Sequence, residues 1–170
     1  MKILSGRYKG LTIDTSKNIL YRPTQTRIRK SIFDILAPFT YSSVLDLYSG
    51  SGILGFESAS RGAESITFVD NNSASIKMLN RNKTKFDSPE FFVIRKKVFS
   101  YLKGLNDNYD LIFADPPYDK LDYSLLINMC IEKLSINGKL IVEMSNNKFS
   151  FKDSIERKYG DTKIVICNQK

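Results

Sequence analysis

The chain has 170 residues, of which 42% are hydrophobic, and such a chain can bury a sizeable core, so a largely disordered protein is excluded. We expect one domain over residues 1–170. There is no histidine, which excludes histidine bases and histidine metal ligands. The two cysteines, Cys130 and Cys167, lack paired-ligand spacing and are typical of small buried hydrophobes, so no metal is expected. No signal peptide and no run of eighteen apolar residues is present, so we expect a soluble cytoplasmic protein without a membrane segment.

The net charge of +8 points to an anionic partner such as nucleic acid. Residues 1–30 contain eight lysines and arginines and one aspartate, and therefore hold seven of the eight net positive charges. A partner that binds by charge should meet this segment, which we predict to be a basic hairpin and loop extension that faces RNA.

In chain order, residues 2–8 and 11–13 surround Gly6 and Gly10 and predict a short β-hairpin. Near its turn the hairpin carries two basic residues and one aromatic residue, Arg7, Lys9 and Tyr8. Such an element is suited to RNA, although it is equally typical of a hairpin that only covers the edge of a sheet.

A helix is predicted after Arg22-Pro23-Thr24, with Thr24 as its N-cap. Its apolar stripe, at helical spacing, consists of Ile28, Ile32, Phe33, Ile35 and Leu36. On or beside the polar face we expect four cations, Arg22, Arg27, Arg29 and Lys30. Four cations within nine residues indicate phosphate contact about as strongly as they indicate a solvated face.

Residues 43–48 predict the first core strand, which runs into the turn Ser49-Gly50-Ser51-Gly52 and then into a helix. Gly50 and Gly52 allow the backbone to turn tightly and to approach a ligand closely. The second strand, residues 65–69, ends at Asp70, whose two oxygens can bind both hydroxyls of a ribose. Strand, glycine turn and helix together predict a nucleotide-binding βα unit.

Two ligand classes fit these spacings. The glycines match GxGxxG, and Asp70 lies eighteen residues past Gly52, so a dinucleotide-dependent oxidoreductase is one interpretation. Asp46, just before the glycine turn, favours a different ligand class, because a carboxylate repels a pyrophosphate but attracts a cationic amino acid group. S-adenosylmethionine has such a group, a ribose for Asp70 and no phosphate.

Beyond Asp70, strands and helices alternate. We predict helices over 73–86, 99–105 and 121–134, strands over 90–94, 109–114, 139–144 and 162–167, and a helical or irregular piece that ends over 155–159. This order predicts an α/β fold, a mostly parallel sheet with helices on both faces and an antiparallel edge strand.

The strand over 109–114 leads into Asp115-Pro116-Pro117-Tyr118. The prolines lack N–H donors and have fixed φ, so they hold the backbone open where the strand ends and where ligands of α/β sheets bind. The Asp115 carboxylate and the proline carbonyls can accept hydrogen bonds from a planar amino group while Tyr118 stacks on the base that carries it. The same element can accept hydrogen bonds from the N6 amino group of adenine or from the N4 amino group of cytosine.

The sequence resembles the class I S-adenosylmethionine-dependent methyltransferases and, within them, the RsmD-type family. The similarity covers essentially the whole chain and is carried by residues 3–10, Arg22-Pro23-Thr24 with Arg27 and Arg29, residues 45–52, 68–70, 115–118 and 159–162. It implies a Rossmann-like fold with a seven-stranded, mostly parallel sheet plus a short N-terminal β-hairpin. It also implies methyl transfer to the exocyclic N2 of one guanine in 16S ribosomal RNA, alone or in an assembled or assembling 30S particle.

The resemblance assigns three sets of residues. The catalytic set is Asp115, Pro116, Pro117 and Tyr118. The cofactor set is Asp46, Tyr48, Ser49, Gly50, Gly52, Asp70, Asn71, Lys97 and Val98. The RNA set is Arg7, Tyr8, Lys9, Arg22, Thr24, Arg27 and Arg29.

The chain departs from the family pattern at Lys30 and Lys97, where the family usually has acidic residues. Lys97 cannot accept a hydrogen bond from the adenine amino group. A non-catalytic RNA-binding domain is the remaining alternative, and only an activity measurement separates it from the enzyme.

Overall fold

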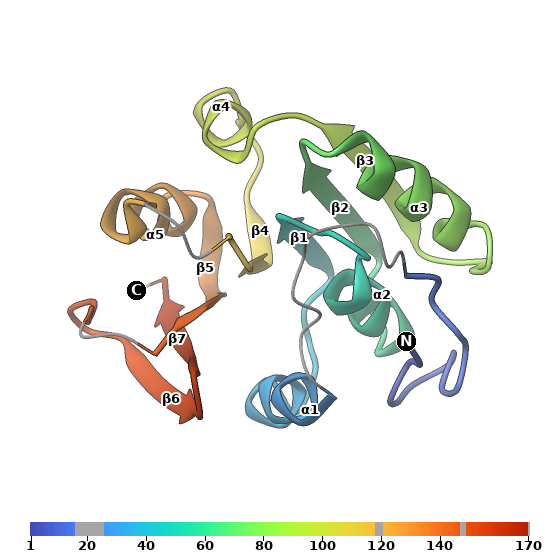
Figure 1. Ribbon diagram of the computed structural model, residues 1–170, viewed down its shortest axis with the longest axis horizontal. Coiled ribbons are helices and arrows are strands. Elements are labelled where there is room, and N and C mark those ends of the chain that lie inside the picture. The colour runs from blue at the N-terminus through green and yellow to red at the C-terminus, as the bar shows by residue number, and fades with distance from the viewer. Residues whose placement is uncertain (16–25, 118–120, 147–148, 170) are drawn as a thin grey trace.

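The computed structural model describes residues 1–15, 26–117, 121–146 and 149–169, and is built around one seven-stranded sheet (Figure 1). Its strands are β1 (Ser43–Leu47), β2 (Ser65–Asp70), β3 (Glu90–Arg95), β4 (Tyr109–Ala114), β5 (Leu134–Ser145), β6 (Ile155–Tyr159) and β7 (Thr162–Asn168). In space they follow the order β3-β2-β1-β4-β5-β7-β6. The strands β1 to β5 are parallel and β7 is antiparallel to both β5 and β6, which confirms the predicted mostly parallel sheet with an antiparallel edge.

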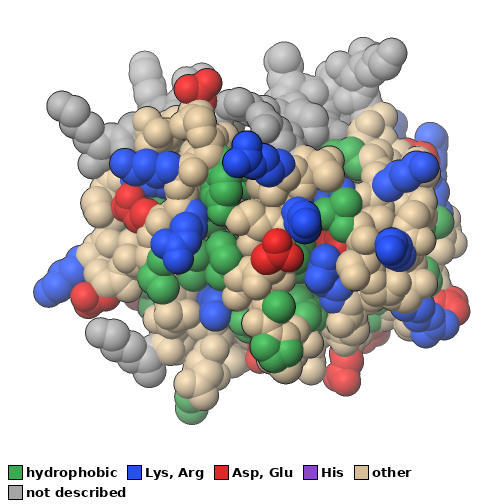
Figure 2. Space-filling model, turned by 90° about the horizontal axis from the view of Figure 1, so that it is seen from below, with side chains coloured by type: hydrophobic (Ala, Val, Ile, Leu, Met, Phe, Trp, Pro, Cys, Tyr) green, Lys and Arg blue, Asp and Glu red, His purple; other side chains and the backbone are tan. Residues whose placement is uncertain are grey.

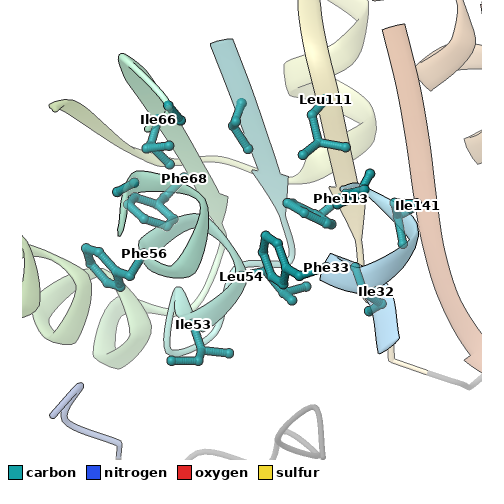
Figure 3. Packing of buried hydrophobic residues seen from close by; sticks show 14 of the residues in the cluster. Ile32, Phe33, Ile53, Leu54, Phe56, Ile66, Phe68, Leu111, Phe113 and Ile141 are labelled. Atoms are coloured by element: carbon teal, nitrogen blue, oxygen red, sulfur yellow. The ribbon is translucent and has the colours of Figure 1, made fainter. Parts of the chain in front are cut away.

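Helices cover both faces of the sheet, because the side chains of the buried strands alternate between two apolar clusters. The first cluster receives the helices α1 (Thr26–Ile35), α2 (Ile53–Ser60) and α3 (Ser73–Lys83), and the second receives α4 (Val98–Lys103) and α5 (Tyr123–Ile131). Figure 3 shows the first cluster, where Phe33 of α1 and Phe56 of α2 pack against Phe68 and Phe113 of the sheet. None of the helices formed by the described residues is long and apolar enough to cross a membrane.

The sheet has two edges of different character. The carboxyl edge is defined here as the side of the sheet at which the strands β1 to β5 end, and the outermost strands are not meant. There Leu47 of β1 lies beside both Val69 of β2 and Ala114 of β4. The chain runs outward in opposite directions from β1 and β4, so this pair is the topological switch point at which α/β sheets bind ligands. The fold therefore brings together the segments that follow β1, β2 and β4.

The N-terminal segment lies toward the other end of the strands, the amino edge. A single antiparallel bridge joins Lys2 and Thr12, so the predicted hairpin is present in a minimal form without strands of its own. Ile3 and Ile13 are buried in the first cluster. The turn of the hairpin packs on the last residue of α2, where the Arg7 N–H donates to the Ser60 carbonyl at 2.7 Å. Because α2 starts at the carboxyl edge and runs back, the tip of the hairpin lies at the amino edge.

Three predicted elements differ from the structure. Residues 155–159 form the strand β6 and no helix, because the turn Gly160-Asp161 folds them back onto β7 as a hairpin with Gly160 at φ +60°. β5 starts at Leu134 instead of residue 139, and α5 ends at Ile131. Asn137-Gly138, between the predicted helix and the predicted strand, lies in an irregular stretch of β5 where the pairing of β4 with β5 shifts register.

Candidate active site

The glycine turn after β1 is fixed by its surroundings. Gly52 has φ +76°, and a Cβ atom there would lie 2.5 Å from Leu79 Cδ2 and 2.8 Å from Phe56 Cε2. Gly50 also has positive φ, at +52°, and the Gly52 N–H closes the turn on the Ser49 carbonyl at 2.7 Å. The backbone therefore passes the carboxyl edge in one defined conformation, close to the sheet.

Ser49 ties this turn to the second strand. Its buried hydroxyl accepts a hydrogen bond from the Val69 N–H at 2.9 Å and donates to the Asp46 carbonyl at 2.5 Å. The Ser49 N–H in turn donates to the Val69 carbonyl at 3.2 Å. The Ser49 side chain, predicted to bind cofactor, is thus placed inside the protein, where it positions the turn.

Asp70 lies at the end of β2, beside the turn. One carboxylate oxygen accepts the Gly50 N–H at 2.9 Å and the other accepts the Asn72 N–H at 2.8 Å. A carboxylate oxygen has two lone pairs, so each can still accept a ribose hydroxyl. Asn71, which follows, is exposed, and its carbonyl accepts a long hydrogen bond of 3.4 Å from Arg95 Nε. Backbone donors therefore orient Asp70 toward the space next to the turn.

Asp46 is the most perturbed acid of the site. Its side chain is 3% exposed and accepts the Gly55 N–H at 3.0 Å. Burial raises the pKa of Asp46 to about 8, the Gly55 hydrogen bond opposes this and the charge of Asp70 adds to it. A cationic group placed beside this carboxyl group would stabilise its charged form. A carboxylate at this position accepts hydrogen bonds from the ammonium of an amino acid and repels a phosphate.

Tyr48 has left-handed backbone, with φ +56°, at the point where β1 becomes the turn. Its half-buried side chain packs against the second apolar cluster. Burial also raises the pKa of the Tyr48 phenol to about 12, so it remains a hydrogen-bond donor at neutral pH.

The Asp115-Pro116-Pro117 segment leaves β4 directly beside the glycine turn. The Asp115 N–H points to the Leu47 carbonyl at 3.5 Å, and Leu47 is the last residue of β1. Asp115 is half-buried, Pro116 is buried and Pro117 is exposed. Tyr118 lies outside the described residues, so its stacking role stays a prediction. The predicted acid of the catalytic set thus lies at the switch point, next to the predicted cofactor turn.

Lys97 and Val98 follow β3 and begin α4. Lys97 is the N-cap residue of α4, its side chain makes no capping hydrogen bond and it is exposed. Val98 is buried in the second apolar cluster. The side chain of Val98 therefore faces the core, so the predicted cofactor contact of Val98 would be made by its backbone.

The predicted RNA residues of the hairpin lie at the amino edge, away from the carboxyl edge. Arg7 pairs with Asp87 at 2.6 Å, and the Tyr8 hydroxyl donates to Asp87 and lies 2.9 Å from the Ser88 carbonyl. The Tyr8 ring packs edge-on against Phe86, with centroids 4.6 Å apart. Since β3 begins at Glu90, just beyond these residues, the fold separates the hairpin tip and its exposed Lys9 from the catalytic set by the length of the strands.

Arg29 was expected on or beside the polar face of its helix, but it is buried. Arg29 is 1% exposed, and its Nη2 donates to the Lys2 carbonyl at 2.7 Å. The guanidinium thus ties α1 to the N-terminal segment and is not available to RNA in this structure. Arg27, on the same helix, is exposed as predicted, whereas Arg22 and Thr24 lie outside the described residues.

Glu57 is a buried acid that the sequence analysis missed. It has no exposed surface, and its oxygens accept the Leu4 N–H at 2.7 Å, the Ser5 N–H at 3.1 Å and Arg61 Nε at 3.0 Å. It fastens the N-terminal hairpin to α2, the helix that starts at the glycine turn. The available signal was its position in a short helix that is otherwise apolar or small, where a charge requires a partner.

Similarity to known proteins extends over most of the chain. The model of the family described as "Conserved hypothetical protein 95" matches residues 1–168. The ribosomal RNA small subunit methyltransferase D of Buchnera aphidicola (subspecies Baizongia pistaciae) is 34% identical over 152 residues, which cover 86% of this chain and 76% of that protein.

Among solved structures, the YhhF protein of Escherichia coli superposes with a TM-score of 0.87 and 23% identity, covering 99% of this chain and 97% of that chain. The SMU.776 protein, solved in complex with SAH, superposes with a TM-score of 0.69 and 19% identity, covering 87% of this chain and 50% of that chain. The fold is thus that of the class I methyltransferases, and the chain belongs to the family described as "Conserved hypothetical protein 95", which is the family of the RsmD-type methyltransferases.

Proposed function

We propose that this protein transfers a methyl group from S-adenosylmethionine to the exocyclic N2 of one guanine in 16S ribosomal RNA. The observation that carries the proposal is the position of Asp115, which leaves β4 beside Leu47, where β1 enters the glycine turn. The name of the Buchnera relative supports small-subunit ribosomal RNA as the substrate. The guanine, and its N2 atom, come from the family resemblance.

The residues around the glycine turn fit the cofactor. Asp46 offers a buried carboxyl group for the cationic amino acid end, and Asp70 offers oxygens for the ribose. Gly50 and Gly52 let the backbone approach without side chains in between. When bound there, S-adenosylmethionine supplies a methyl group on a sulfonium, which is an electrophile that needs no metal.

The catalytic set acts on the amino group of the base. Guanine N2 is a weak nucleophile because its lone pair is delocalised into the ring. The Asp115 carboxylate and the Pro116 carbonyl accept its two hydrogens and so favour a pyramidal nitrogen whose lone pair points at the methyl group. As the new C–N bond forms, the C–S bond breaks, S-adenosylhomocysteine leaves, and one N2 proton passes through the Asp115 carboxylate to water. Most of the acceleration comes from positioning.

The base must leave its stack to reach this segment. Extruding a nucleotide costs a few kcal/mol, and stacking on an aromatic ring offsets part of that cost. We assign that stacking to Tyr118. The substrate is small-subunit ribosomal RNA, alone or within an assembled or assembling 30S particle.

The proposal is tested with radiolabelled S-adenosylmethionine and small subunits that lack their native methylation, followed by mapping of the label. The expected product carries label on N2 of a single guanine. Label on adenine N6 or cytosine N4 would overturn the assigned base but retain the reaction class. No label in free RNA, subunits or assembly intermediates would overturn the function.

A variant pair assigns the role of Asp115. Asp115→Asn should lower turnover by at least 100-fold, a loss typical of a polar group that acts at the reacting atoms, while S-adenosylhomocysteine binding stays within about twofold. Asp107→Asn, which removes an exposed carboxylate from the loop before β4, is the control and should change neither quantity. Equal loss of binding and turnover in Asp115→Asn would place this residue in the cofactor site instead.

A further inference from the structure

Positive charge is widely distributed on this protein. Figure 2 shows lysine and arginine side chains spread over one whole face, with acidic side chains between them. Net charge alone therefore does not locate the surface that meets RNA. The relevant cations are those that lie at the carboxyl edge and are not used by ion pairs within the protein.

Three consecutive residues meet both conditions. Arg95 ends β3, and Lys96 and Lys97 follow it directly at the carboxyl edge. All three side chains are exposed, and none forms an ion pair with any residue that the structure describes. We call these residues the β3-end cluster. By contrast, Arg7 and Lys85 pair with Asp87 and Asp14.

The backbone of the β3-end cluster is held beside the candidate active site. Arg95 lies opposite Asp70 in the backbone register of the parallel strands β2 and β3, and the Lys96 N–H donates to the Asp70 carbonyl at 3.1 Å. Arg95 Nε also lies 3.4 Å from the Asn71 carbonyl. The Lys97 carbonyl accepts the Tyr101 N–H of α4 at 2.9 Å. The three cations thus project from a backbone fixed to the same segment that carries Asp70.

The cluster also lies at a suitable distance from the methyl-transfer site. β3 is two strands away from β1 and three from β4, which places its end about 10–15 Å from the glycine turn and from Asp115 at ordinary strand spacing. An extruded base lies outside its own strand, so the phosphates on either side of it contact the surface around the site and not the site itself. Cations at this distance can bind those phosphates without contacting the base.

We propose, on the basis of the ribosomal RNA methyl transfer proposed above, that the β3-end cluster binds backbone phosphates of the RNA next to the target nucleotide. Lys97 thereby becomes a substrate-binding residue, because an exposed ammonium donates to phosphate oxygens and cannot accept from an adenine amino group. The hairpin tip with Arg7 and Tyr8, at the amino edge, is not needed for this contact.

The experiment compares the wild type with the triple variant Arg95→Gln, Lys96→Gln, Lys97→Gln. Binding of unmethylated 16S RNA, transcribed in vitro, is measured by filter retention at several salt concentrations, and S-adenosylhomocysteine binding by calorimetry. A charge-matched control removes three cations away from the carboxyl edge, by Lys83→Gln, Lys103→Gln and Lys139→Gln. A second control, Arg95→Lys, Lys96→Arg, Lys97→Arg, retains the charge.

Each phosphate contact contributes about 0.7–0.9 to the slope of log affinity against log salt concentration. The triple variant should therefore lose about two to three units of that slope and on the order of 100-fold in RNA affinity at 0.1 M salt. Its affinity for S-adenosylhomocysteine should stay within about twofold. The charge-retaining variant should keep most of the RNA affinity, and the charge-matched control should lose clearly less.

Three results would overturn the proposal. The triple variant could lose no more RNA affinity than the charge-matched control, so that only general charge matters. It could lose cofactor affinity with unchanged RNA binding, which would place Lys97 in the cofactor site. A salt slope equal to that of the wild type would show that no phosphate contact was removed. Failure of the proposed function is a separate outcome, since wild-type protein would then transfer no methyl group to any form of the RNA.

Discussion

Replacing Glu57 by alanine tests how the N-terminal hairpin is held to the methyltransferase core. Two backbone donors, of Leu4 and Ser5, would lose their acceptor, at about 1–2 kcal/mol each in a partly buried place. Arg61 would lose its charged partner as well. Together these losses predict a decrease in the free energy of unfolding of about 4 kcal/mol, within the range of about 3–5 kcal/mol for breaking a buried charged pair.

The assay is urea denaturation followed by circular dichroism, together with thermal melting. For a chain of this size, a loss of about 4 kcal/mol lowers Tm by roughly 8–16 °C. Glu57→Gln retains one carbonyl acceptor and should lose about half as much. Glu64→Ala, which removes an exposed carboxylate next to the same helix, is the control and should stay within about 0.5 kcal/mol of the wild type. A Glu57→Ala protein within about 1 kcal/mol of the wild type would refute the reasoning.

Three more predictions use matched changes. The pKa of Asp46 is about 8 against an ordinary 3.8, so the folded state binds more protons between these values and stability falls as pH rises from about 4 to about 8, by up to about 1.4 kcal/mol per pH unit. Asp46→Asn should flatten that fall in urea titrations at several pH values, and an unchanged slope would contradict the assignment. Gly52→Ala should lower the free energy of unfolding by about 2–4 kcal/mol and weaken S-adenosylhomocysteine binding, because the new Cβ atom would clash with its neighbours at a residue with positive φ. Gly10→Ala is the control, since Gly10 has φ +87° but open space around it, and it should cost only about 1–2 kcal/mol. Melting and calorimetry measure both, and equal losses would show that strain alone matters. Arg29→Gln should lower Tm by several degrees without changing the salt slope of RNA binding, and Arg27→Gln should do the reverse; RNA binding that depends on Arg29 in a fully folded variant would refute its structural role.

The order of the elements could be predicted because each strand and helix of the parallel part has its own local pattern. The outermost strand, β6, could not. One face of β6 carries Ile155, Arg157 and Tyr159 and the other carries Glu156 and Lys158. Arg157 thus interrupts the apolar alternation that marks a strand. The strand character of β6 comes from pairing with β7 through the turn at Gly160, and that glycine was the signal to use. Similarly, Asn137-Gly138 could end a helix or shift the register of a strand, and only the pairing with β4 decides.

The candidate site also contains residues that could be predicted from the sequence and residues that could not. The positions of Asp46, Gly52 and Asp70 could be predicted because they follow from the chain next to them, at the ends of β1 and β2. Glu57 and Arg29 are not predictable, because their partners at Leu4, Ser5 and Lys2 lie 27 or more residues away along the chain. A buried charge reveals its role only when the fold shows what it meets.

The distribution of charge illustrates why sequence position and surface position differ. Residues 1–30 hold most of the net charge, which pointed to an RNA surface there. In the structure Arg29 holds α1 to the first residues, and Arg7 pairs with Asp87 at the amino edge. Since the predicted catalytic set lies at the carboxyl edge, we expect cations beside it to contribute more to substrate positioning than a larger number at the opposite end of the strands. The β3-end cluster carries three positive charges, fewer than residues 1–30, and its place next to Asp70 is the reason for proposing that it determines how RNA is presented for methyl transfer.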